Sequence, residues 1–86
     1  MSEKSNYDEI SELLINNGFT QNPNYLLKEV DINGEKDTIM FRQKEDRLIL
    51  MNVSKNEVLL DQNPKDSELN QEAFKQQFFK AIQEKL

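Results

Sequence analysis

The dipeptide Asn33-Gly34 constrains the fold of this chain more than any other feature of its sequence. It lies between two runs of residues, 25–32 and 35–42, that are rich in strand-forming side chains. A two-residue type I′ turn needs positive φ at both central positions, and asparagine and glycine adopt positive φ most readily. The sequence therefore predicts a β-hairpin in which Ile32 stands opposite Glu35.

This tight turn also decides which side chains of the hairpin share a face. Opposite residues of an antiparallel pair point to the same side of the sheet, and the side alternates along each strand. One face receives Leu26, Lys28, Val30, Ile32, Glu35, Asp37, Ile39 and Phe41. The other face receives Tyr25, Leu27, Glu29, Asp31, Lys36, Thr38, Met40 and Arg42.

Apolar residues at helical spacing predict one helix at each end of the chain. The first helix is expected over residues 6–17, with Gly18 closing it in a left-handed conformation. The last helix is expected from Asn70 to the C-terminus, because an apolar stripe begins at Phe74. The stripe consists of Phe74, Phe78, Phe79, Ile82 and Leu86.

Two more strands are expected between the hairpin and the last helix. A polar link over residues 43–46 precedes a strand at 47–53, and a turn at 54–56 precedes a short strand at 57–60. Segments 20–24 and 61–69 each contain a proline and are predicted loops. The expected fold class is α+β, an antiparallel three- to four-stranded meander flanked by an N-terminal and a C-terminal helix, in a single small domain spanning residues 1–86.

Both faces of this predicted sheet are apolar, although an antiparallel sheet with one solvated face alternates cleanly. The face that holds Phe41 gains Leu48 and Leu50, and the face that holds Met40 gains Ile49, Met51, Val53, Val58 and Leu60. The first explanation is that each helix covers one face, or that the strand register differs from the predicted one. The second is that both helices pack on the Phe41 face. The second arrangement leaves a candidate partner-binding surface of Tyr25, Leu27, Glu29, Asp31, Met40, Ile49, Met51 and Val53.

Catalytic chemistry has few candidate residues in this chain. It contains no histidine and no cysteine, which removes the commonest general base and the most nucleophilic side chain. The acidic loop that begins at Asp31 departs from a calcium-binding loop, since Lys36 replaces its glycine and Arg42 its bidentate glutamate. We expect no catalytic, cofactor-binding or metal-binding residues and a protein that is not an enzyme.

Charge and hydropathy limit the kinds of partner that the chain can bind and the part of the cell in which we expect it. Sixteen acidic and eleven basic residues give a net charge of −5, and no cluster of lysine and arginine is present to bind nucleic acid directly. An acidic surface favours a basic partner. No apolar run approaches the ~20 residues of a membrane span, and residues 1–5 do not resemble a signal peptide. We expect a cytoplasmic protein.

These observations predict a small acidic protein that binds another protein as an inhibitor, an immunity protein or antitoxin, or an adaptor. An origin in a phage or mobile element would fit such a role. One alternative is a nucleic-acid mimic that inhibits a DNA-binding enzyme, which requires one continuous acidic surface formed by Asp8, Glu9, Glu12, Glu29, Asp31 and Asp37. The other alternative is a structural homodimer without a separate ligand.

Overall fold

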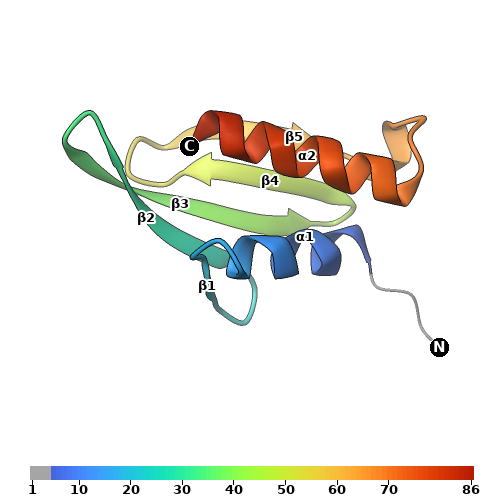
Figure 1. Cartoon of the computed structure of the whole chain (residues 1–86), viewed down its shortest axis with the longest axis horizontal. Coiled ribbons are helices and arrows are strands. Elements are labelled where there is room, and N and C mark those ends of the chain that lie inside the picture. Colours follow the sequence, from blue (N-terminus) through green and yellow to red (C-terminus); the bar gives the residue numbers. More distant parts are fainter. Residues whose placement is uncertain (1–4) are drawn as a thin grey trace.

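The computed structural model describes residues 5–86, so residues 1–4 and most of the segment judged not to be a signal peptide lie outside the described residues. A helix at each end of the chain flanks a five-stranded sheet in sequence (Figure 1), which confirms the predicted α+β class and element order. Neither of the two helices described within 5–86 is long and apolar enough to cross a membrane. The elements are α1 (Asn6–Ile15), β1 (Thr20–Gln21), β2 (Leu26–Ile32), β3 (Glu35–Lys44), β4 (Arg47–Asn52), β5 (Glu57–Gln62), a 3₁₀ turn (Pro64–Asp66) and α2 (Gln71–Lys85).

The sheet is an antiparallel meander with the strand order β1-β2-β3-β4-β5. It contains one strand more than predicted, because the segment predicted as a loop at 20–24 includes β1. This strand is only two residues long and pairs Thr20 with Leu27 and Gln21 with Leu26. The fourth predicted strand forms as β5 and extends to Gln62.

The Asn33-Gly34 turn has the predicted geometry. Asn33 has a φ of 54° and Gly34 a φ of 84°, and the strands pair from Ile32 with Glu35 to Leu26 with Phe41. The next connection is tighter than predicted, because β3 continues to Lys44, which pairs with Arg47. Only two residues connect these strands, and Glu45 adopts a φ of 57° there.

A β-bulge in β5 corrects one prediction about the sheet faces. Leu50 pairs with Leu60, but the neighbouring Met51 pairs with Val58, so Leu59 is an extra residue in β5. The extra residue reverses the alternation, and Leu60 lies on the face of Leu50 instead of the face of Met51. Leu59 and Leu60 both pack against the core.

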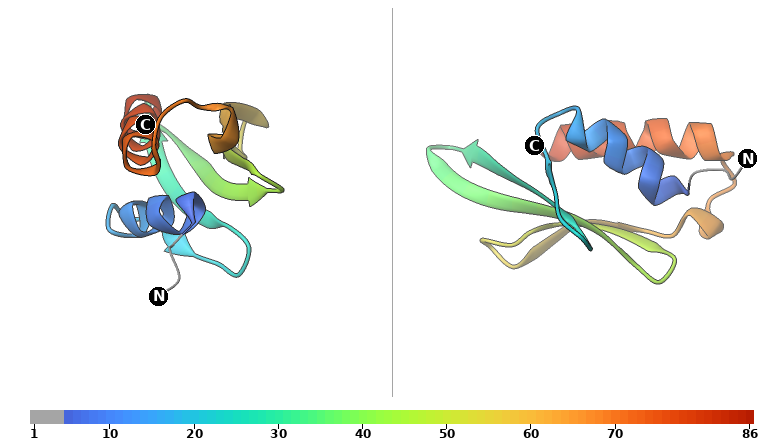
Figure 2. Two further views of the ribbon diagram at one scale, coloured as in Figure 1. Left: turned by 90° about the vertical axis from the view of Figure 1, so that its right-hand side faces the viewer. Right: turned by 90° about the horizontal axis from the view of Figure 1, so that it is seen from below.

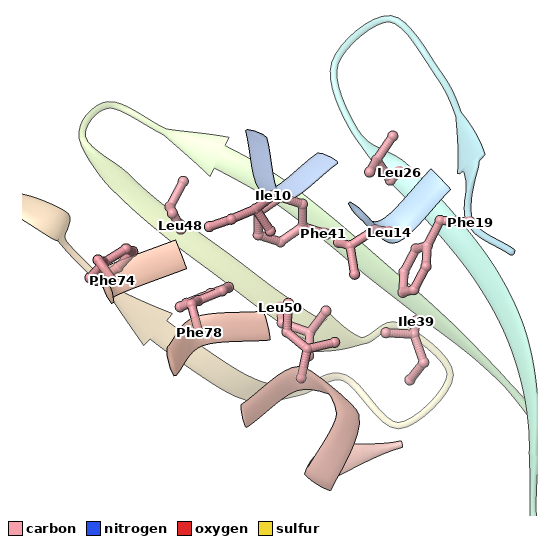
Figure 3. Packing of buried hydrophobic residues seen from close by; sticks show 11 residues of the cluster. Ile10, Leu14, Phe19, Leu26, Ile39, Phe41, Leu48, Leu50, Phe74 and Phe78 are labelled. Carbon is pink, nitrogen blue, oxygen red and sulfur yellow. The ribbon is translucent and has the colours of Figure 1, made fainter. Parts of the chain in front are cut away.

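Both helices cover the same face of the sheet, which is the face that holds Phe41 (Figure 2). Phe41 is fully buried, and its ring lies 5.2 Å from the Tyr7 ring of α1 and 5.9 Å from the Phe78 ring of α2, measured between centroids. The side chains of this core converge between the helices and the sheet (Figure 3). They are Ile10, Leu14, Phe19, Leu26, Ile39, Phe41, Leu48, Leu50, Phe74, Phe78 and Ile82.

Polar side chains fix the ends of both helices. The Ser5 hydroxyl accepts a hydrogen bond from the Asp8 amide, and the Asn70 side-chain oxygen accepts one from the Ala73 amide. At the other end of α1, the ammonium group of Lys28 donates to the Asn17 carbonyl at 2.9 Å. The two caps stabilise the first turns of the helices, and the Lys28 contact joins β2 to the segment that follows α1.

Candidate functional site

The outer face, which we define as the side of the sheet turned away from α1 and α2, carries an apolar row across four strands. Leu27, Met40, Met51 and Val58 are successive register partners on β2, β3, β4 and β5. Val58 is 55% exposed, and the other three side chains are partly exposed. We call these four residues the outer row.

A second row beside the outer row combines apolar and charged groups. Ile49 pairs with Arg42 on one side and with Asp61 on the other. Ile49 is only 8% exposed although no helix lies over it, which we attribute to its long neighbours on the same face. The Nε atom of Arg42 is buried and has no hydrogen-bond partner.

An ion pair lies beside Ile49 at this end of the outer face. The Nε atom of Arg47 donates to the Asp61 carboxylate at 2.7 Å. This hydrogen bond and the negative charge of Asp61 raise the pKa of Arg47 above its ordinary value. Both side chains are well exposed, so the pair is a surface feature and contributes little to stability.

The opposite end of the outer face is acidic on β2. Glu29 pairs with Thr38, and Asp31 pairs with Lys36. Glu29 and Asp31 are both exposed. Val53 follows β4 at this end, where its amide donates to the Thr38 carbonyl at 2.8 Å and its side chain is 45% exposed.

Strand alternation brings all eight candidate partner-binding residues of the sequence to this one face. Tyr25 precedes β2 and Val53 follows β4, and the other six lie within strands. The structure adds Thr20, Arg42 and Val58 to the same face. The predicted strand alternation had placed Arg42 and Val58 on this face, although neither was a binding candidate. Thr20 could not be predicted, because β1 is too short to show a pattern in the sequence. The role of these residues in binding stays a prediction.

The six carboxylates that a nucleic-acid mimic would combine are divided among three places. Asp8, Glu9 and Glu12 belong to α1, whereas Glu29 and Asp31 lie on the outer face. Asp37 is only 3% exposed on the helix-covered face. This division does not support the continuous acidic surface that the mimic requires.

Asp37 has a structural role at the edge of the core. Its Oδ2 atom accepts a hydrogen bond of 3.0 Å from the buried Asn52 side chain and lies 3.5 Å from the Lys55 ammonium. Asn52 in turn accepts a hydrogen bond from the Lys55 amide through its side-chain oxygen. The carboxylate therefore ties β3 to the turn between β4 and β5.

Asp37→Ala is expected to lower the free energy of unfolding by about 1 to 3 kcal/mol, because it leaves the Asn52 amide buried without its acceptor. Urea denaturation measures the change. Asp37→Asn retains an oxygen acceptor for the Asn52 amide, so its free energy of unfolding should fall by less. Equal losses in the two variants would show that the hydrogen bond to Asn52 does not matter.

The described residues define a small α+β domain whose helices cover one face of a five-stranded meander. Within 5–86, no group of three histidine, cysteine or acidic side chains lies close enough to hold a metal ion. The chain matches no protein-family model, no curated protein and no solved structure.

Proposed function

We propose that this chain is a small acidic protein-interaction protein that binds another protein through the outer face. The observation that carries the proposal is the outer row of Leu27, Met40, Met51 and Val58, which no helix of the described chain covers. A water-facing side of an antiparallel sheet ordinarily carries polar residues. A continuous apolar row on such a side is typical of a contact surface.

The composition of the outer face favours a protein as the partner. Met40 and Met51 lie side by side at its centre, and methionine adapts its shape to an irregular surface better than branched side chains do. Charged side chains surround the apolar centre, as in the polar rim of many protein interfaces.

Charge favours a partner that is basic where it meets β2. The chain has a net charge of −5, and Glu29 and Asp31 are exposed on the face that carries the outer row. Complementary charge accelerates association and excludes wrong partners. A role as an inhibitor, an immunity protein or antitoxin, or an adaptor requires only such a surface and no catalytic residues.

The proposal is tested by capture of partners from an extract of the source cells with Met51→Asp and a matched control, Gln83→Asp. The control places the same carboxylate at an exposed position of α2. A genuine partner is retained by wild type and Gln83→Asp and is lost with Met51→Asp. Identical sets of captured proteins from folded wild type and Met51→Asp would contradict the proposal.

Light scattering on the purified chain tests the homodimer alternative. We expect a monomer across a range of concentrations, because in this proposal the outer face binds a different protein and not a second copy. A dimer that Met51→Asp converts into a folded monomer would assign the outer face to self-association instead.

A further inference from the structure

The edge of the sheet at β2 is open over most of its length. β1 pairs only with Leu26 and Leu27, and no strand within residues 5–86 lies beside 28–32 on that side. In Figure 1 the β2–β3 hairpin extends away from the short β1 strand. Edge strands with unpaired backbone groups are templates for the addition of a further strand.

The backbone groups that face this open edge belong to Glu29 and Asp31. The Asn22 amide donates to the Tyr25 carbonyl at 2.9 Å, so the backbone of Tyr25 faces β1. In an antiparallel strand this direction alternates with a period of two residues, so Leu27, Glu29 and Asp31 face the same way. The two-residue turn after Ile32 agrees, because it directs the backbone of Ile32 and every second residue before it toward β3.

A surface cavity lies at the point where β1 ends and the open part of the edge begins. It has a volume of about 600 Å³, and Thr20, Leu27, Glu29 and Thr38 contribute to its lining. Thr20 is the first residue of β1, and Glu29 is the first β2 residue with outward-facing backbone groups beyond the pairing with β1. The cavity therefore borders the open stretch of the β2 edge at Glu29, beside the segment that contains β1.

The charges beside this edge indicate which kind of added strand it can bind. The Lys28 ammonium is directed to the helix side, where it donates to Asn17 and lies 5.7 Å from the centre of the Phe19 ring. The charged side chains that β2 itself places on the outer side are the exposed Glu29 and Asp31, and Lys36 lies opposite Asp31 on β3. Antiparallel pairing of two copies through this edge would place these acids against one another, and directly opposed like charges destabilise a sheet.

We propose that the edge of β2 at residues 28–32 binds an extended, basic segment of the partner protein as an added antiparallel strand. Residues of that segment opposite Glu29 and Asp31 share the outer side and are lysine or arginine. Residues opposite Val30 and Ile32 share the other side, where both side chains are partly buried, and are apolar. This inference rests on the proposed function and specifies the chemistry and backbone conformation of the partner.

The probe that matches this pattern is a short peptide of alternating lysine and valine, blocked at both ends, and its glutamate–valine counterpart is the negative control. Amide hydrogen exchange of the whole chain is measured by NMR with and without each peptide. The lysine peptide is expected to slow exchange of the Glu29 and Asp31 amides at least about tenfold, because they become donors to an added strand. Unchanged exchange at both amides under saturating peptide would overturn the proposal.

Asp31→Pro removes one outward-facing donor and leaves the hydrogen bonds between β2 and β3 intact, since proline is tolerated at such edge positions. It is expected to abolish peptide binding. The double substitution Glu29→Gln and Asp31→Asn preserves the backbone and should weaken binding about tenfold at low salt. Its matched control is Glu68→Gln with Glu84→Gln, which changes the net charge equally on exposed residues elsewhere and should bind as wild type does. Equal binding by both double variants would overturn the proposed charge selection.

Two further outcomes separate this inference from the proposed function. Protection of Glu29 and Asp31 that grows with protein concentration in the absence of peptide would assign the edge to a second copy and overturn the proposal. Capture of the partner by Asp31→Pro but not by Met51→Asp would uphold the outer face and overturn strand addition. Capture by both variants would contradict the proposed function itself.

Discussion

Phe41→Ala is expected to lower the free energy of unfolding by about 3 to 5 kcal/mol, the range for truncation of a buried phenylalanine. Phe41 is fully buried, and its ring contacts an aromatic ring from each helix. Its removal leaves a cavity between α1, α2 and β3 that the stacked Tyr7 and the tilted Phe78 cannot fill without moving. The substitution therefore weakens the attachment of both helices to the sheet at once.

The size of this effect matters because the domain is small. A chain of 86 residues has a total stability of roughly 4 to 13 kcal/mol, and one residue can remove a large part of it. Urea denaturation followed by circular dichroism measures the loss. Phe79→Ala is the matched control, because Phe79 is only partly buried at the edge of the same core and should lose less than half as much. Similar losses in the two variants would place the centre of the core elsewhere.

The hairpin could be predicted from sequence because its information is local. Asn33-Gly34 specifies the turn, and the turn specifies the pairing from Ile32 with Glu35 to Leu26 with Phe41. The same alternation places the candidate residues on one face. The helices were similarly predictable from apolar spacing, and the structure places Ser5 and Asn70 as their N-caps.

The features that the sequence did not predict depend on contacts between distant residues. β1 is two residues long, too short to show a pattern, and it forms because the chain after α1 returns along β2. The bulge at Leu59 arises where β5 must pair with β4 and also contribute side chains to the core. It moved Leu60 to the face that the helices cover.

The side of the sheet that each helix covers could also not be predicted from the sequence. An apolar stripe on α2 shows which face of the helix is buried, but it fits an apolar face on either side of the sheet. The structure decides this point through Phe41, whose ring contacts Tyr7 of α1 and Phe78 of α2. The helices therefore leave the apolar residues of the outer face uncovered, and the binding of a partner there stays a proposal.

Leu50→Asp is expected to unfold the domain, whereas Met51→Asp is expected to leave it folded. The two residues are neighbours on β4, so strand position and substitution are matched and only the face differs. Leu50 is fully buried under the helices, and an aspartate there would place a carboxylate in the core without a partner. Burial of an unpaired charge costs at least several kcal/mol, which approaches the total stability of the domain.

Met51 is partly exposed on the outer face, where a carboxylate can reach water. We expect Met51→Asp to cost about 1 kcal/mol, mainly because aspartate is a poor strand former. Far-UV circular dichroism and a thermal melt of the two variants measure the contrast. Two folded variants would show that the helices do not seal the Phe41 face, and two unfolded variants would show that the outer face is already covered. Only the expected contrast leaves the outer row free for a partner, and it also ensures that loss of binding by Met51→Asp reports on the surface and not on the fold.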